Sequence, residues 1–258
     1  MVRKRFGQHF LISRHVIECL IDEIHPLVGE CLIEIGPGPG ALTVPLLKKI
    51  GKLDVIEIDR DLILSLKRHC EGQGDLIVHE ADALRFDIGS VIPKNKKARL
   101  VGNLPYNIST PLIFHLLKSA ARVLDMHFML QKEVVDRMAA PPSHEAYGRL
   151  SVMVQYHCKV SSLFDVPPSS FAPPPKVDSS VVRLTPHSTL PHVANDYSQF
   201  AIIVREAFSH RRKTLRNALK PFVSDAIWSF IAIDPQKRPE ELSVEDFVRI
   251  SNAIENTI

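Results

Sequence analysis

The stretch Cys31-Leu32-Ile33-Glu34-Ile35-Gly36-Pro37-Gly38-Pro39-Gly40 decides the fold of this chain. Its first five residues are a short, largely apolar run, which predicts a buried strand. The glycines that follow permit backbone angles that other residues avoid, and they let a ligand approach the main chain closely. Residues 41–50 then place Leu42, Leu46 and Leu47 on one helical face. The stretch therefore predicts a strand, a tight turn and a helix, with a nucleoside-like ligand at the turn.

The same alternation of apolar runs and helical segments continues to about residue 132. Strands are expected at residues 31–35, 53–58, 76–78, 98–101 and 126–130, and helices at 41–50, at 61–70 and from Thr110 onward. Thr110 is expected to cap its helix, with Pro111 at the first helical position. Strands that alternate with helices indicate an α/β fold, with a mostly parallel sheet covered on both faces.

Proline residues mark the boundaries of the later part of the chain. Two proline runs flank Phe171, and a strand is expected from Val177 to Leu184. From about residue 195 the pattern is helical, and Ser243 with Asp246 resembles a capping box before the last helix. We therefore expect two domains: an α/β domain over residues 1–188, which includes a basic N-terminal segment, and a small helical domain over residues 189–258.

The composition of the 258 residues is that of a globular protein, with 45% hydrophobic and 24% charged residues. No apolar run approaches the roughly 18 residues of a membrane-spanning helix, and the basic start lacks the apolar core of a signal peptide. The four cysteines and twelve histidines have neither disulfide-framework nor metal-ligand spacing. We expect a cytoplasmic monomer with no metal and no membrane partner.

Positive charge is concentrated in two segments, although the net charge is only +3. Residues 1–15 have four Lys or Arg and no acidic residue, and residues 205–220 have six against Glu206 alone. Adjacent cations repel one another unless an anion neutralises them, so these segments predict contacts to nucleic-acid phosphates. The expected contacts are Arg3, Lys4, Arg5, Arg211, Arg212, Lys213 and Arg216. The alternative is a pair of solvated surface segments.

Acidic residues are expected to end the second and third strands of the parallel sheet, at the edge where such sheets bind ligands. Glu57 is placed to accept both hydroxyls of a ribose, and Asp82 to accept from an adenine amine. The G-x-G-x-G spacing, stiffened by Pro37 and Pro39, favours S-adenosyl-L-methionine. A dinucleotide-binding fold shares the strand-turn-helix pattern, and strand-end or helix-capping roles are the alternative for both carboxylates.

The residues Asn103-Leu104-Pro105-Tyr106 follow the fourth of these strands. The Asn103 side-chain oxygen and the Leu104 carbonyl can hold the hydrogens of an exocyclic amine, while Pro105 stiffens the turn and Tyr106 offers a stacking face. The amine of adenine is a poor nucleophile, so orientation matters more than a strong base. The loop therefore predicts methyl transfer to adenine, with an ordinary turn as the alternative. Phe171 is expected to be a second stacking wall, with a core plug as its alternative.

Eight stretches of the chain resemble the ribosomal RNA small-subunit adenine dimethyltransferases. They are RKRFGQHFL at 3–11, EIGPGPGALT at 34–43, VIEIDRDL at 55–62, VGNLPYNISTPLIFHLL at 101–117, DMHFMLQKEV at 125–134, YGRLSVMVQY at 147–156, FAPPPKVDSSVVRL at 171–184 and EAFSHRRKTLRNAL at 206–219. The resemblance implies a Rossmann-like class I methyltransferase domain that uses S-adenosyl-L-methionine, with a small all-α C-terminal domain. It also implies dimethylation of two adjacent adenosines in the 3′-terminal hairpin loop of 16S rRNA, within the assembling pre-30S subunit.

The resemblance also implies roles for individual residues. The cofactor contacts fall on His9, Leu11, Gly36, Glu57, Asp82 and Asn103, and Gly38 and Gly40 complete the glycine turn. The target-adenine contacts fall on Asn103, Leu104, Tyr106 and Phe171. The family usually has Asn where this chain has His9, so a main-chain contact from this segment survives the change better than a side-chain contact.

Other functions remain open at this point. A large-subunit rRNA adenine methyltransferase would share the cofactor motifs and the loop, although residues 171–184 and 209–219 favour the small-subunit family. A DNA adenine methyltransferase would need a target-recognition domain larger than the roughly 65 residues after 194. A nicotinamide oxidoreductase would have no use for residues 103–106. The alternative from another class is an rRNA-binding ribosome-assembly factor whose methylation is secondary.

Overall fold

A computed structural model describes residues 8–209 and 212–255 of the chain. The chain divides into two compact units. The first comprises the residues up to Val135 together with Ser161–Pro186, and the second comprises Asp136–Val160 together with the residues from His187 onward. The boundary expected after residue 188 lies next to the last of these divisions. The sequence predicts that residues 136–160 belong to the first domain, whereas the structure groups them with the C-terminal helices.

The first unit is built on a seven-stranded sheet with the order β4-β3-β2-β5-β6-β9-β7. The strands are β2 (Cys31–Ile35), β3 (Lys52–Glu57), β4 (Asp75–Glu80), β5 (Ala98–Asn103), β6 (Val123–Gln131), β7 (Cys158–Val166) and β9 (Ser179–Pro186). Strands β2 to β6 pair in parallel, and β9 runs antiparallel to β6. The prediction of a mostly parallel sheet is confirmed.

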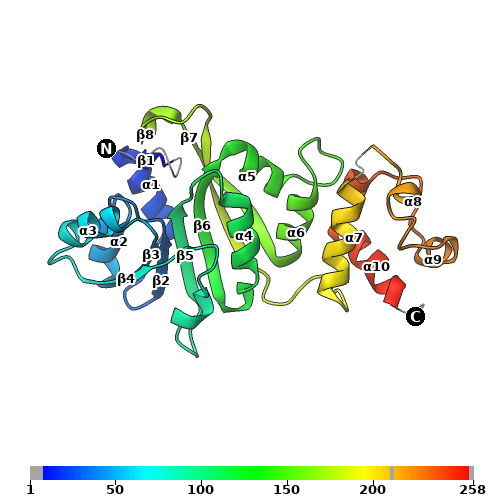
Figure 1. Cartoon of the computed structure of the whole chain (residues 1–258), viewed down its shortest axis with the longest axis horizontal. Coiled ribbons are helices and arrows are strands. Elements are labelled where there is room, and N and C mark those ends of the chain that lie inside the picture. Colours follow the sequence, from blue (N-terminus) through cyan, green and yellow to red (C-terminus); the bar gives the residue numbers. More distant parts are fainter. Residues whose placement is uncertain (1–7, 210–211, 256–258) are drawn as a thin grey trace. The chain divides into compact units, whose positions relative to one another are not determined.

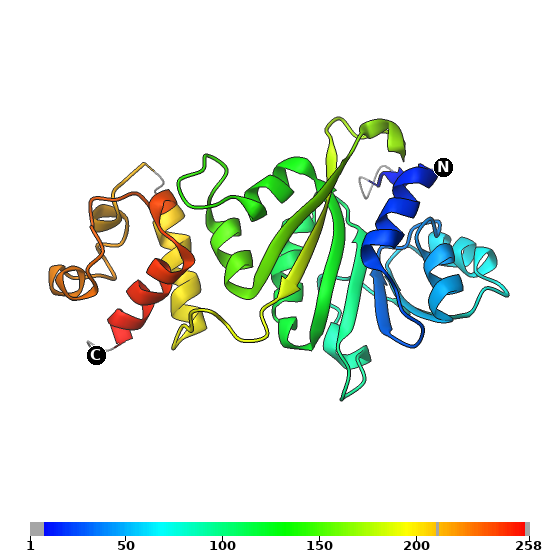
Figure 2. The same ribbon diagram turned by 180° about the vertical axis from the view of Figure 1, so that it is seen from behind.

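Helices cover both faces of this sheet, as expected. They are α1 (Arg14–Ile24), α2 (Thr43–Ile50), α3 (Arg60–His69) and α4 (Ser109–Leu117). Leu20 of α1, Leu46 of α2 and Leu66 of α3 share one buried cluster with the sheet residues Leu32 and Val55. In Figure 1, α4 lies in front of the sheet, whereas in Figure 2, seen from behind, α1 lies in front of it.

The start of α4 differs from the prediction. Thr110 does not cap the helix, which begins at Ser109 after Ile108, a residue without a side-chain cap. The preceding loop sets the start instead, because the Ile108 N–H donates to the Pro105 carbonyl and the Ser109 hydroxyl donates to the Tyr106 carbonyl. The helix therefore grows directly out of the loop that carries the predicted acceptors.

A second, two-stranded sheet ties the N-terminal segment to the proline-rich segment. Strand β1 (Phe10–Leu11) pairs antiparallel with β8 (Phe171–Ala172), which follows the short 3₁₀ helix η4 (Pro168–Ser170). The N–H groups of Ile12 and Ser13 both donate to the Ser170 carbonyl. Residues far apart in the sequence are thus held together beside the large sheet.

The second unit is helical in its C-terminal part, as predicted. Its helices are α6 (Arg149–His157), α7 (Tyr197–Ser209), α8 (Leu215–Ala218), α9 (Asp225–Ile231) and α10 (Val244–Glu255), with the 3₁₀ helix η5 (Pro239–Glu241). Helix α5 (Lys132–Ala139) runs from the sequence of the first unit into that of the second. The predicted capping box is confirmed, because Asp246 N–H donates to Ser243 Oγ and Ser243 N–H donates to Asp246 Oδ2.

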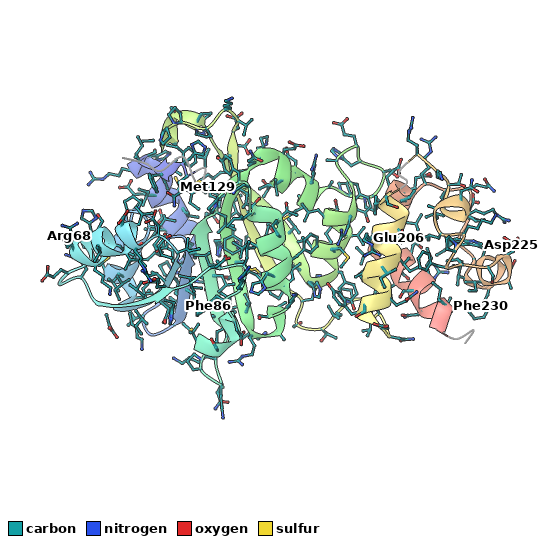
Figure 3. The ribbon with its side chains drawn as sticks, in the orientation of Figure 1. Arg68, Phe86, Met129, Glu206, Asp225 and Phe230 are labelled. Atoms are coloured by element: carbon teal, nitrogen blue, oxygen red, sulfur yellow. The ribbon has the colours of Figure 1, made fainter. Side chains whose placement is uncertain are left out.

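The interior of each unit is well defined by its buried side chains. Met129 of β6 is fully buried in the first unit, and the buried Tyr147 hydroxyl of the second unit donates to the Leu242 carbonyl at 2.8 Å. By contrast, Phe230 of α9 is 79% exposed. Met129 and Phe230 are both labelled in Figure 3. Among the described residues, no helix has both the length and the apolar character needed to cross a bilayer.

Candidate active site

A cavity lies at the carboxyl edge of the parallel strands of the first unit. It has about 1050 Å³ of empty space, part of which is open to solvent. Its walls come from the glycine turn after β2, the ends of β3 and β5, the segment after β4 and the N-terminal residues Gln8–Leu11. Because open parallel sheets bind ligands at this edge, the cavity is the candidate site.

The glycine turn forms the floor of the cavity. Gly38 and Gly40 have φ angles of +55° and +101°, which residues with a side chain rarely adopt. A Cβ atom on Gly38 would lie 3.2 Å from the Phe10 ring, and one on Gly40 would lie 2.9 Å from Leu66 Cδ1. Gly36, with φ of +66°, donates its N–H to the Ile56 carbonyl. The turn therefore exposes bare main chain to a ligand.

Glu57 ends β3, as the sequence predicts, and its side chain is nearly completely buried. Its Oε1 accepts hydrogen bonds from the Ile58 and Asp59 N–H groups at 2.9 and 3.0 Å, and its Oε2 accepts from Gly38 at 3.3 Å. Burial raises the pKa of the Glu57 carboxyl, and these main-chain donors oppose the rise. Its two oxygens have further lone pairs, so Glu57 can still accept hydrogen bonds from the two hydroxyls of a ribose while it accepts from these three N–H groups.

Asp82 lines the cavity but does not end a strand, because β4 ends at Glu80. Its Oδ1 accepts from the Leu84 N–H at 2.9 Å, and its main-chain carbonyl accepts from Arg85 and Phe86. The Asp82 side chain therefore closes a turn, and among the described residues no helix begins there for it to cap. Its position in the cavity wall still allows it to meet a ligand.

Glu34 also lines the cavity, although its position in the sequence predicts no role for it. Its side chain is 2% exposed, and its Oε2 has no hydrogen-bond partner among the described residues. Burial raises the pKa of this carboxyl to about 8; the nearby Thr43 hydroxyl opposes the rise and the charge of Glu57 adds to it. The signal in the sequence is a single acidic residue within an apolar strand, two positions before the first glycine.

Asn103 ends β5 with its amide orientation set by the N-terminal segment. Its Nδ2 donates to the His9 carbonyl at 2.8 Å, which leaves Oδ1 as the atom that can accept. The Leu104 N–H donates to the Met129 carbonyl at 3.1 Å. Among the described residues, neither Asn103 Oδ1 nor the Leu104 carbonyl accepts a hydrogen bond. Both predicted acceptors are therefore open.

Tyr106 also lines the cavity, and two other segments hold its ring. Its hydroxyl lies 2.6 Å from Ser179 Oγ, and its ring centroid lies 5.5 Å from that of His9, with planes tilted by 31°. Burial raises the pKa of the Tyr106 hydroxyl. His9 Nδ1 donates to the Pro173 carbonyl at 2.7 Å, since a carbonyl can only accept. The His9 side chain is thus directed toward Tyr106 and Pro173.

Phe171 is not brought into the cavity wall. It is 2% exposed and belongs to the main buried cluster, together with Leu11 and Val166. This position matches the core plug that is the alternative to a stacking wall. The aromatic side chain that faces Tyr106 is His9, for which the sequence predicted only a cofactor contact. Leu11 and Pro105, both predicted, line the cavity.

The predicted RNA contacts are only partly described by the structure. Arg3, Lys4, Arg5 and Arg211 lie outside the described residues. Arg212 and Lys213 are exposed, whereas Arg216 Nη1 forms an ion pair with Asp225 at 2.7 Å. Within the described residues, no three His, Cys, Asp or Glu side chains gather as a metal site would require.

The fold and the cavity together define the class of the protein. A Rossmann-like sheet, a glycine turn, a carboxylate at the end of β3 and an amine-accepting loop are the parts of a methyltransferase that uses S-adenosyl-L-methionine. The residues present fit this cofactor, because the bare main chain at Gly38 and the buried Glu57 carboxylate line the same cavity. Glu57 would hold its ribose, and the bound cofactor would supply an electrophilic methyl group.

The chain belongs to the ribosomal RNA adenine dimethylase family, whose pattern it matches over residues 1–256. It is 54% identical over 259 residues to the ribosomal RNA small subunit methyltransferase A of Chromohalobacter salexigens, covering 99% of this chain and 92% of that protein. It is also 54% identical over 252 residues to the protein of that name from Pseudomonas aeruginosa, covering 98% and 94%.

Solved structures agree with this assignment. The chain is similar to a dimethyladenosine transferase from Plasmodium falciparum, with a TM-score of 0.79 and 30% identity over 94% of this chain and 96% of that one. The 23S rRNA methyltransferase ErmE has a TM-score of 0.73 at 21% identity, covering 95% and 99%, and supports the fold alone. The protein is an rRNA adenine dimethyltransferase that uses S-adenosyl-L-methionine, so the predicted fold class, activity and cofactor are confirmed.

Proposed function

We propose that this enzyme dimethylates the exocyclic amines of two adjacent adenosines in the 3′-terminal hairpin loop of 16S rRNA, within the assembling pre-30S subunit. The observation that carries the chemistry is the pair of open acceptors, Asn103 Oδ1 and the Leu104 carbonyl, beside the cofactor cavity. Support for the small subunit as target comes from the near full-length relatives named ribosomal RNA small subunit methyltransferase A.

The two acceptors orient the amine. Each holds one amine hydrogen, and together they turn the nitrogen lone pair toward the methyl group. The donor is already positively charged, so the transition state disperses charge and needs no strong base. Most of the acceleration then comes from orientation and from acceptors placed before the reaction. Pro105 stiffens the loop between Leu104 and Tyr106, and the Tyr106 ring stacks on the target base.

The cofactor side of the site completes this proposal. Glu57 accepts from the ribose hydroxyls, and Asp82 meets the adenine amine of the cofactor. His9 and Leu11, which line the same cavity, also contact the cofactor. Gly36, Gly38 and Gly40 allow the cofactor to lie against the turn. Since Asn103 bonds to the His9 carbonyl, the segment that contacts the cofactor also orients the acceptor that holds the target.

Two basic segments contact the RNA in this proposal. In the second unit, Arg212 and Lys213 are exposed and contact phosphates. Arg211 and the basic residues at 3–5, which lie outside the described residues, are assigned the same role. Arg216 takes this role only if its ion pair with Asp225 opens. The helices after residue 189 act as the rRNA-binding domain, and the enzyme works as a cytoplasmic monomer.

The experiment that tests this proposal measures tritiated methyl transfer from S-adenosyl-L-methionine to undermethylated small ribosomal subunits. Wild type is expected to place two methyl groups on each of two adjacent adenosines. Asn103→Ala should lower the rate about 10²- to 10³-fold, as the loss of one positioned hydrogen-bonding group does in other enzymes. Asn95→Ala, at an exposed loop position outside the cavity, is the matched control.

Other outcomes would redirect the assignment. Transfer to large subunits or DNA would leave the cofactor site intact and overturn the proposed substrate. Tight binding to small subunits with unaltered assembly in the Asn103→Ala strain would favour an assembly factor whose methylation is secondary.

A further inference from the structure

A buried serine outside the Asn-Leu-Pro-Tyr loop holds the Tyr106 hydroxyl. Ser179 Oγ lies 2.6 Å from the Tyr106 oxygen, and the two residues are 73 positions apart in the sequence. Ser179 is fully buried at the start of β9, where it pairs with Gln131 of β6. The hydroxyl is therefore anchored on the sheet, and the loop alone does not set the orientation of the Tyr106 ring.

The Tyr106 ring has two contacts from other segments. Ser179 holds its hydroxyl, and the His9 ring lies beside it at a centroid distance of 5.5 Å with the ring planes tilted by 31°. The hold on a stacked base therefore depends on how well Tyr106 itself is positioned.

The two methyl transfers place different demands on this ring. In each transfer the amine nitrogen bonds to the methyl carbon as the carbon–sulfur bond breaks, the sulfonium becomes a thioether, and the amine releases one proton to water. An unmethylated amine has two hydrogens for Asn103 Oδ1 and the Leu104 carbonyl. A monomethylated amine has one, so one acceptor loses its partner. Stacking on Tyr106 then carries a larger share of the binding of the intermediate.

We propose that Ser179 is a positioning residue that, through the Tyr106 hydroxyl, makes the enzyme complete the second methylation. This inference rests on the proposed function. When Tyr106 loses its hydrogen bond to Ser179, its ring is positioned less precisely. The monomethylated base then dissociates more often before it is methylated again. The product then shifts from N6,N6-dimethyladenosine toward N6-methyladenosine.

The test compares the ratio of monomethylated to dimethylated adenosine, measured by mass spectrometry of nucleosides from undermethylated small subunits at limited turnover. Ser179→Ala and Tyr106→Phe should each raise the ratio about 3- to 10-fold, as expected for one lost hydrogen bond. The control is Ser180→Ala, because this neighbouring buried serine instead donates to the Phe164 carbonyl at 3.2 Å. It should leave the ratio at the wild-type value.

A double variant separates positioning from folding. If Ser179 acts through the Tyr106 hydroxyl, Ser179→Ala combined with Tyr106→Phe should change the ratio no more than either substitution alone. Affinity for the cofactor, measured by calorimetry, should stay within about 2-fold of wild type. A wild-type ratio in Ser179→Ala, or additive effects in the double variant, would overturn the inference.

Two further readouts keep the outcomes distinct. Total methyl transfer by the wild type tests the proposed function, so failure there is seen before any ratio is compared. If methyl groups go to another nucleic acid, the ratio is measured on that substrate. If Ser179→Ala does not fold by circular dichroism, Tyr106→Phe carries the test, and a wild-type ratio in it would overturn the inference equally.

Discussion

Replacing Glu34 with Gln should stabilise the protein by an amount that grows as the pH rises from 5 to 7. The carboxyl is buried beneath the cofactor cavity, its Oε2 has no partner among the described residues, and burial raises its pKa to about 8 from an ordinary value of 4.5. The charged form is therefore costly in the folded state, and a neutral amide of the same shape avoids that cost.

The sign and size of the effect follow from proton linkage. Between pH 4.5 and pH 8 the folded state binds more protons at Glu34 than the unfolded state, so wild-type stability falls as the pH rises. The contribution is fully present below pH 4.5 and is lost as the pH passes through 8. Since one pKa unit corresponds to about 1.4 kcal/mol, the loss between pH 5 and pH 7 is on the order of 2 to 3 kcal/mol. The Glu34→Gln variant should not show this loss of stability between pH 5 and pH 7.

The assay is urea unfolding followed by far-UV circular dichroism at pH 5 and pH 7. Tryptophan fluorescence is less suitable, because the single tryptophan, Trp228, lies in the second unit. Glu71→Gln, which removes an exposed carboxyl of the first unit, is the control. A stability difference between Glu34→Gln and wild type that is the same at both pH values would refute the reasoning.

Two other predictions concern ligand binding. Glu57→Gln should weaken the binding of S-adenosyl-L-methionine about 10- to 100-fold in calorimetry, because a hydrogen bond to a charged acceptor contributes about 1.5–3 kcal/mol. An unchanged affinity would exclude Glu57 from the ribose site. Replacing both Arg212 and Lys213 with Ala should reduce the slope of log affinity for small subunits against log salt concentration by about 1 to 2. The control replaces exposed Lys48 and Lys49 with Ala, and equal slopes in the two variants would show that Arg212 and Lys213 make no phosphate contacts.

Local patterns predicted most of the first unit. The strand at residues 31–35 has the predicted bounds, and the other parallel strands and their helices lie within a few residues of their predicted positions. These elements depend on apolar residues at short, regular spacing, which is visible in any window of the chain. The start of α4 was misplaced because main-chain bonds of the preceding loop, and not a side-chain cap, set it.

Residues whose role depends on distant partners were less predictable. Phe171 is equally suited by residue type to stacking on a base or to packing in the core, and only the structure shows that it pairs with Leu11 and is buried in the core cluster. Asp82 follows a strand in the sequence, but Ala81 separates it from the end of β4, and its Oδ1 accepts from the Leu84 N–H in the turn that follows. Glu34 is visible as an acidic residue, whereas its raised pKa arises only from burial.

The sequence by itself determined the parallel α/β sheet, the glycine turn and the loop with two possible acceptors, because residues within a few positions of one another specify these features. Only the tertiary structure decided which atoms remain open. The His9 carbonyl, 94 positions from Asn103, takes the amide nitrogen and leaves the oxygen to accept, and Ser179 fixes the Tyr106 hydroxyl from 73 positions away. Such partners meet only when the whole unit has folded, because burial and hydrogen bonding depend on distance in space and not along the chain.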